Sequence, residues 1–222
     1  QYFWFDHVGT ANADAKDMNG YFSSLLYANV DRYSYTQTTE QFVQFYSEGM
    51  FIGYGYSLAW ADDTKTTLKV RMVEPRGPVG LAGLKRGDTI VSIDGNTPQQ
   101  VVAGTPGRVT TTGIPRTLVY RDGGGVTRTL MVNSAEFAYV SVPSVQVFTQ
   151  DVGGSAVKVG YMAYQQFINA SNPELAAAIN TFADAGVKQL IVDLRYNGGG
   201  SIAVARDLAS MIGGSSLSGR VF

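Results

Sequence analysis

The chain has 222 residues, of which 45% are hydrophobic, and its 17 basic and 18 acidic side chains leave a formal net charge of −1. This near-neutral balance, with no basic cluster, argues against nucleic-acid binding through a charged face. The sequence has no cysteine and a single histidine, His7, which excludes disulfides, thiolate catalysis and metal sites built on cysteine or on two histidines.

The first 47 residues are predicted to be helical. Apolar residues recur at helical spacing within residues 17–30, namely Met18, Tyr21, Phe22, Leu25 and Leu26. Thr38, followed three residues later by Gln41, predicts a short capped helix. His7 lies in an aromatic run, which indicates packing rather than catalysis.

From about residue 50 the pattern changes to strands and turns. Strands are predicted over residues 50–60, 66–73 and 88–94, the last closed by the turn Asp94-Gly95. Residues 116–121 and 126–132 flank an Asp-Gly-Gly-Gly turn and predict a hairpin. Short helices are predicted over residues 78–83 and from Thr97, with Pro98 at the first helical position.

The third region, from about residue 136, alternates strands with helices. Strands are predicted over residues 138–148, 158–164 and 189–194, with a buried run from Leu190 to Val192. A helix capped by Asn172 is predicted between the last two strands, ending at Gly186. A final helix is predicted to carry its apolar face on Ile202, Ala205, Leu208, Ala209 and Ile212. This order predicts a parallel sheet.

A glycine loop at residues 197–200 joins the last strand to the last helix. Such a turn aims backbone N–H groups at one point, where an oxyanion or a phosphate can bind. Gly198, Gly200 and Ala203 also fit the dinucleotide fingerprint, but the acidic residue expected about 20 positions later is missing, since the only later acid is Asp207. A plain structural turn is a further alternative.

Ser201 directly follows the glycines and is a candidate nucleophile by position. A nucleophilic serine needs a base within hydrogen-bond reach, and sequence alone cannot place a lysine beside Ser201. Capping of the next helix is the expected role of Ser201.

Four segments in order resemble the C-terminal processing peptidases, also called tail-specific proteases. Residues 80–95 resemble a PDZ signature, although Gly80 and Leu81 stand where the family often has Pro and Ala. Residues 159–167 are similar to the strand that opens the family's catalytic core, and residues 31–35 resemble the end of its helical N-terminal region. The fourth segment, similar to the family's D-L-R-x-N-x-G-G motif, is Asp193-Leu-Arg-Tyr-Asn-Gly-Gly-Gly200.

The resemblance implies a multidomain α+β fold. A helical N-terminal region is expected over residues 1–47, a PDZ-like peptide-binding domain over residues 48–135, and the first part of a Clp-protease/crotonase-like α/β core over residues 136–222. The family uses a Ser–Lys pair that follows the glycine motif, so we expect both residues beyond residue 222. Gly199 and Gly200 are then expected to form the oxyanion loop.

The PDZ resemblance implies capture of protein C-termini as an added strand. The loop Gly53-Tyr54-Gly55-Tyr56 resembles the family's carboxylate loop, and a glycine-kinked strand is the alternative interpretation. Leu68, Val70 and Val101 are candidates for the pocket of the terminal side chain.

The resemblance therefore predicts a serine endopeptidase acting on polypeptides with free C-termini. No cofactor, metal or nucleic acid is expected, and no apolar run approaches the ~20 residues of a membrane span. The expected location is exported, in the periplasm or cell envelope of a bacterium. The alternative is a non-catalytic PDZ peptide-binding module or an inactive peptidase homologue.

Overall fold

The computed structural model describes residues 2–27, 30–31 and 34–214. The chain divides into two compact units, Gln1–Val43 and Gln44–Phe222, which are described separately. Within the described residues the architecture is mixed α/β, with three separate sheets. Of the segment 31–35 that resembles the family, Arg32 and Tyr33 lie outside the described residues.

The N-terminal unit contains short helical segments: η1 (Phe5–His7), α1 (Met18–Leu25) and α2 (Thr39–Phe42). Thr38 and Gln41 form the predicted capping box at the start of α2. The helix predicted over residues 17–30 ends at Leu25, and its apolar positions do not form a core, since none of its residues is buried and Met18 is 84% exposed. His7 stacks on Tyr27 at 4.7 Å between ring centroids, as expected for a packing role.

The second unit begins within η2 (Val43–Ser47), a π-helical turn. Two strands, β1 (Met50–Gly53) and β7 (Ala135–Ala138), pair antiparallel in a sheet of their own. The prediction of one strand over residues 50–60 is therefore wrong. The chain leaves β1 at Gly53 and enters a different sheet at Tyr56, the first residue of β2.

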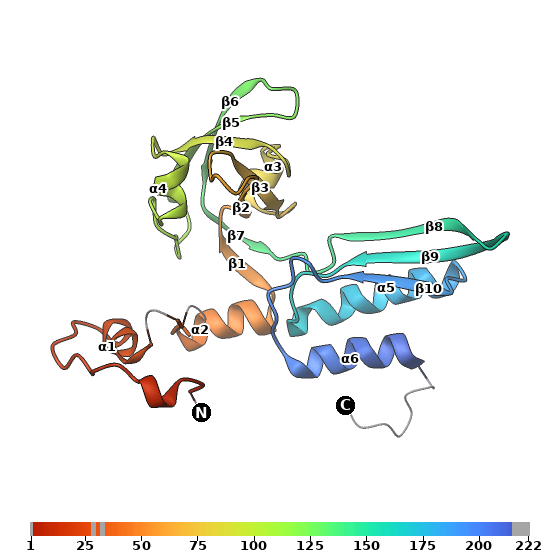
Figure 1. Ribbon diagram of the computed structural model, residues 1–222, viewed down its shortest axis with the longest axis horizontal. Helices are drawn as coiled ribbons and strands as arrows, with labels where there is room; N and C mark the ends of the chain where they lie inside the picture. Colours follow the sequence, from red (N-terminus) through yellow and green to blue (C-terminus); the bar gives the residue numbers. More distant parts are fainter. Residues whose placement is uncertain (1, 28–29, 32–33, 215–222) are drawn as a thin grey trace. The chain divides into compact units, whose positions relative to one another are not determined.

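Between β1 and β7 lies a five-stranded antiparallel sheet with the order β2-β3-β4-β5-β6 (Figure 1). Its strands are β2 (Tyr56–Trp60), β3 (Leu68–Val73), β4 (Thr89–Ile93), β5 (Pro115–Arg121) and β6 (Thr127–Asn133). The predicted hairpin is confirmed, because β5 and β6 pair along their full length. The short helices α3 (Pro78–Leu81) and α4 (Pro98–Val102) are also confirmed, the latter with Thr97 as its cap. Core positions include Leu68, Ile93 and Leu118, all fully buried.

The last region forms a three-stranded sheet with the order β10-β9-β8. Its elements are β8 (Ser144–Val152), β9 (Ser155–Ala163), η3 (Asn169–Ser171), α5 (Asn172–Asp184), β10 (Gln189–Asp193) and α6 (Ile202–Gly213). The predicted parallel pairing is confirmed between β9 and β10, while β8 runs antiparallel to β9. Both helices lie on one side of the sheet (Figure 1), where Met162, Phe182 and Leu208 form a buried cluster.

Several local expectations for this region are wrong. The strand expected over residues 138–148 begins at Ser144, because the N–H groups of Val140 and Val142 donate to carboxylates rather than to a neighbouring strand. Asn172 is the first residue of α5, not its cap, and the capping position falls to Ser171.

Burial also differs from the predicted pattern. Strand β10 is not fully buried, since Ile191 points away from the helices and is 48% exposed. On α6 the buried residues are Val204 and Leu208, whereas Ile202 is 77% exposed, so the apolar face is rotated from the predicted one.

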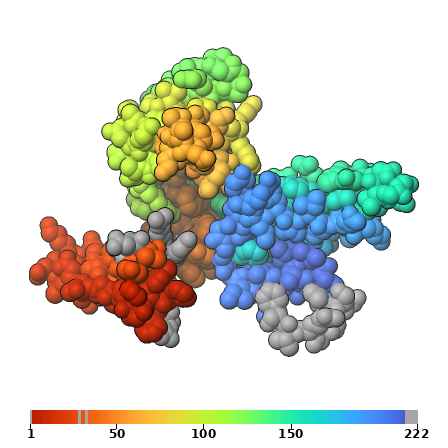
Figure 2. All heavy atoms as spheres, in the orientation of Figure 1, coloured from red at the N-terminus to blue at the C-terminus, as the bar shows by residue number. Residues whose placement is uncertain are grey.

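Strand β8 is largely exposed, whereas β9 is buried at Val159, Gly160 and Met162. Figure 2 shows the hairpin of β8 and β9 in teal on the viewed face, and every residue of β8 after Ser144 is exposed. Across the described ranges, no helix is long and apolar enough to cross a membrane.

Candidate functional site

The glycine loop lies between the carboxyl end of β10 and the start of α6. At residue 200 the backbone of this loop accepts only glycine. Gly200 has φ +133°, and a Cβ there would lie 2.1 Å from the Phe167 carbonyl oxygen. Gly199 has φ +90° but open space around it. The loop is therefore fixed against residue 167 through Gly200, while Gly199 needs glycine only for its dihedral angle.

Hydrogen bonds decide which N–H groups of this loop are available to a ligand. The Gly198 N–H donates to the Gln165 carbonyl at 2.9 Å, and the Ser201 N–H donates to the Phe167 carbonyl at 2.7 Å. The Gly199 N–H donates to Asn197 Oδ1 at 2.7 Å. The N–H of Gly200 has no acceptor within the described part of the chain, and Gly200 is exposed. Of the two predicted oxyanion glycines, Gly200 alone presents an unused donor.

Asn197, the fixed Asn of the D-L-R-x-N-x-G-G resemblance, holds the loop in place, a role that the sequence analysis did not assign to it. Its Nδ2 donates to the Tyr164 carbonyl at 3.1 Å, beside the end of β9, while its Oδ1 accepts from Gly199. One side chain thus connects the loop to the neighbouring strand. Ser201 occupies the capping position of α6, as expected, but its side chain makes no capping hydrogen bond.

Asp193, at the end of β10, is held by two side chains. Arg195 Nη2 donates to its Oδ2 at 2.6 Å, and the Tyr161 hydroxyl donates to the same oxygen at 2.7 Å. These hydrogen bonds, with that of Arg195 the larger cause, hold the pKa of Asp193 well below its ordinary value. Asp193 is therefore a charged anchor for the end of the strand, not a proton acceptor near neutral pH.

The loop Gly53-Tyr54-Gly55-Tyr56 links β1 to β2. Gly55 has φ +83°, and a Cβ there would lie 2.9 Å from Gly77 Cα, which explains the break in the predicted strand. The carbonyl oxygens of Tyr54 and Gly55 accept from the N–H groups of Val79 and Glu74, at 3.1 and 2.8 Å. Residues 53–55 are buried.

Aromatic and cationic contacts fix the tyrosines of this loop. Tyr54 is 5% exposed, and its hydroxyl donates to the Ile114 carbonyl at 3.1 Å. The Arg116 guanidinium lies 4.3 Å from the Tyr54 ring centroid, and its Nη1 donates to the Tyr56 hydroxyl at 3.4 Å. Burial, the largest cause, raises the pKa of both tyrosines, so their hydroxyls stay neutral.

Strand β2 lies at the edge of its sheet and pairs only with β3 among the described strands. Such an edge offers unpaired backbone groups to an added strand. Val101 on α4 is partly exposed and packs against the same core. Leu68 and Val70 are fully buried within the core, so they do not line an open pocket for a terminal side chain. That part of the expectation is wrong.

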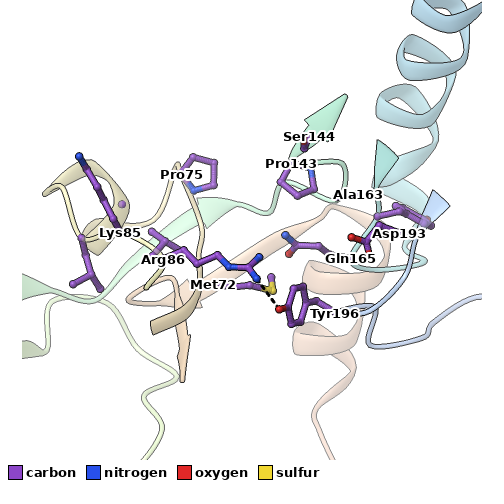
Figure 3. Close-up of a pocket in the computed structure, with 14 residues that line it drawn as sticks. Met72, Pro75, Lys85, Arg86, Pro143, Ser144, Ala163, Gln165, Asp193 and Tyr196 are labelled. Carbon is purple, nitrogen blue, oxygen red and sulfur yellow. Dashed lines mark hydrogen bonds between the residues drawn. The ribbon is translucent and has the colours of Figure 1, made fainter. Parts of the chain in front are cut away.

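A cavity of about 480 Å³ is lined by two sets of residues (Figure 3). One set comes from β3 and the segment after it, including Met72 and Arg86; the other comes from residues 143–165 and the end of β10, including Gln165. Asp193 and Tyr196 connect this cavity to the loop that bears Gly200. Arg86, Gln165 and Tyr196 were not predicted as site residues, because their juxtaposition spans up to 110 residues of sequence.

Metal ligands do not gather in the described residues: no three His, Cys, Asp or Glu side chains there are placed to hold an ion. Neither glycine loop nor cavity contributes such a set.

Comparison with known proteins gives matches to peptidases. Residues 158–219 match the family model of peptidase family S41. The chain is 26% identical over 174 residues to carboxyl-terminal-processing peptidase 2, a chloroplastic protein of Arabidopsis thaliana, covering 73% of this chain and 32% of the plant protein. A solved structure of a putative S41 protease from Bacteroides fragilis superposes with a TM-score of 0.55 and 22% identity, covering 94% of this chain and 56% of that one.

The chain thus spans about a third of the plant relative and just over half of the bacterial one. At 22% identity the structural likeness shows the fold alone. The matched residues 158–219 contain β9 from Lys158 onward, α5, β10, the glycine loop and α6. The predicted resemblance to C-terminal processing peptidases is thereby confirmed: residues 158–219 are similar to peptidase family S41.

Proposed function

We propose that this chain is part of a serine endopeptidase that captures protein C-termini and cleaves them by a Ser–Lys mechanism, with both catalytic side chains beyond residue 222. The observation that supports this most is the unused N–H of Gly200. It belongs to an exposed glycine of the turn at residues 198–200, within the residues that match family S41.

The proposed role of the Gly200 N–H is to stabilise the oxyanion that forms when a serine attacks a peptide carbonyl. A donor fixed before the reaction needs no reorganisation as charge develops, and losing one typically costs ~2.7–4 kcal/mol of transition-state stabilisation. Asn197 holds the loop by engaging Gly199. Lysine acts as the base only if burial or a neighbouring charge lowers its pKa.

The proposed capture site is the free edge of β2, in a PDZ-like domain over residues 48–135. A polypeptide would add there as a further strand, beside α4, with its terminal carboxylate near residues 53–56. Because the carbonyls of Tyr54 and Gly55 are engaged inward, the carboxylate donors are proposed to be N–H groups of the same loop. The location proposed for the whole protein is exported, in a bacterial periplasm or cell envelope.

The oxyanion role is tested by replacing Gly200 with alanine in the protein that includes the serine and lysine. The added Cβ must displace the loop from Phe167, so kcat is expected to fall about 100- to 1,000-fold. The comparison variant is Gly199→Ala, whose Cβ meets open space and whose N–H is already engaged; its φ of +90° strains an alanine, so a fall in kcat smaller than that of Gly200→Ala is expected. A folded Gly200→Ala enzyme with full turnover would show that the loop is only structural.

Carboxylate capture is tested separately by titrating this chain with peptides that have free or amidated C-termini. Amidation is expected to weaken binding at least 10-fold, because a charge-assisted hydrogen bond contributes ~1.5–3 kcal/mol. Equal affinity for the two peptides would contradict carboxylate recognition. Peptide binding together with no cleavage by the longer protein would favour a non-catalytic binding module.

A further inference from the structure

One wall of the cavity in Figure 3 presents a positive charge that has no carboxylate partner. Arg86 Nη2 donates to the Tyr196 hydroxyl at 2.7 Å, and the guanidinium lies 4.9 Å from that ring's centroid. Arg86 forms no ion pair with any described residue. Tyr196 uses only one of the five N–H groups of the guanidinium, so donors remain for a ligand.

Gln165 adds a neutral donor to the same cavity. The side chain is 8% exposed, and its Oε1 accepts from the Tyr139 hydroxyl at 2.8 Å. This contact orients the amide, and Nε2 donates to no acceptor within the described residues. Gln165, Arg86 and Tyr196 all line this pocket, and all three are labelled in Figure 3. Gln165 lines the cavity, and its Nε2 is not among the buried unpartnered atoms, so this N–H is accessible to a ligand oxygen.

The charge balance of the cavity favours an anion. Lys85 and Arg86 are its cationic lining residues, and Asp193 is its single acidic one among the described residues. The Asp193 carboxylate is already neutralised by Arg195 at 2.6 Å. The charges left uncompensated at the cavity are therefore positive.

The remaining walls favour part of a polypeptide over a small ion. Met72, Val73, Leu84 and Pro143 provide apolar surface, and the volume of about 480 Å³ far exceeds that of a phosphate ion. Pockets of this size with a few convergent polar groups are typical of larger ligands. The lining residues Asp193, the last of β10, and Tyr196 also lie just before the glycine loop that bears Gly200.

We propose that this cavity binds an acidic side chain of a polypeptide, with Arg86 and Gln165 donating hydrogen bonds to its carboxylate. The inference deepens the proposed function by adding a preference for substrates with an internal Asp or Glu. It requires neither recognition of a C-terminal carboxylate nor cleavage.

The test uses this chain and peptides blocked at both ends, identical except for a central Glu or Gln. Blocking removes the terminal carboxylate, so failure here is distinguishable from failure of C-terminal capture. The Glu peptide is expected to bind about 10-fold or more tightly than the Gln peptide, measured by fluorescence anisotropy. Equal affinities, or tighter binding of the Gln peptide, would overturn the proposal.

Three variants assign the preference to the cavity. Arg86→Ala is expected to abolish it, and Gln165→Leu to reduce it several-fold. Arg206→Ala removes an equal charge from the exposed face of α6 and is expected to leave the preference intact. Arg86 is exposed, so its replacement leaves the core unchanged. A preference that survives Arg86→Ala, or that inorganic phosphate alone abolishes at micromolar concentration, would overturn the assignment.

Discussion

The five-stranded sheet of residues 56–133 and the three-stranded sheet of residues 144–193 bury their apolar side chains in different ways. The first sheet encloses a core of its own strands and two short helices, with Leu68, Ile93 and Leu118 fully buried. The second depends on α5 and α6, which cover one side only, and leaves Phe148 and Ile191 partly exposed. The first region is therefore expected to be stable by itself, and the second to depend on its helices.

The sharpest test of this contrast is Phe182→Ala in α5. Phe182 is 4% exposed, and its ring lies so close to β9 that a Cβ on Gly160 would lie 2.8 Å from it. Its removal is expected to cost ~3–5 kcal/mol of unfolding free energy. Hydrogen exchange is expected to show lost amide protection in β9 and β10, while β4 and β5 keep theirs.

The matched variant is Leu118→Ala in β5, where a fully buried leucine lies in the other core. It is expected to cost ~2–5 kcal/mol and to give the reverse pattern of protection. If each variant lowers protection equally in both regions, the two sheets unfold as one cooperative unit and the contrast fails.

Between the two sheets, residues 139–143 are held by one carboxylate from each side. Glu74, just after β3, accepts from the Val140 N–H at 3.2 Å, and Glu174, in the first turn of α5, accepts from the Val142 N–H at 2.8 Å. Glu74 is 7% exposed. Burial is the largest cause that raises the pKa of Glu74 from 4.5 to about 7, and repulsion from the Glu174 carboxylate raises it further. The hydrogen bond from Val140 and the positive charge of Arg76 act in the opposite direction and lower this pKa.

Glu74 is therefore expected to make stability depend on pH. The folded protein binds this proton more tightly than the unfolded chain, so the stabilisation is complete below pH ~4.5 and is lost as pH rises to about 7. The expected loss of unfolding free energy is on the order of 1–3 kcal/mol, measured by urea titration at several pH values. Glu74→Gln keeps an acceptor for Val140 and is expected to flatten this part of the profile.

The control variant is Glu174→Gln, which changes the carboxylate on the other side of residues 139–143. It also keeps its acceptor for Val142, but it removes the repulsion on Glu74, so the fall in stability is expected at lower pH. A Glu74→Gln profile identical to that of the original chain would show that the carboxyl titrates normally.

Local signals in the sequence predicted much of this fold. The Thr97-Pro98 helix start, the hairpin turn at residues 122–125 and the parallel pair β9–β10 all follow from short patterns. Long-range contacts account for the failures. The strand over residues 50–60 breaks because Gly55 lies against Gly77, and the strand expected from residue 138 is delayed by Glu74 and Glu174.

The candidate site likewise combines features that local sequence predicts with features that depend on long-range contacts. The glycine loop was visible in the sequence, but the engagement of Gly199 by Asn197 depends on how that side chain folds back between the loop and β9. The cavity depends on Arg86 meeting Tyr196, 110 positions later, and no periodic or motif signal marks such a pair.

The smallest expected effects compare one helix start from each region. Thr97 Oγ1 accepts from the Gln100 N–H, and the Gln100 side chain returns the contact, so Thr97→Ala is expected to cost ~1 kcal/mol of unfolding free energy. Ser201 makes no side-chain capping bond at α6, so Ser201→Ala is expected to change stability by less than ~0.5 kcal/mol. Urea unfolding of both variants measures this difference in unfolding free energy.

Ser201→Ala is also expected to leave turnover of the longer enzyme unchanged, because the hydrogen bond from the Ser201 N–H to the Phe167 carbonyl needs no side chain. Lost turnover in Ser201→Ala would instead place the nucleophile at residue 201.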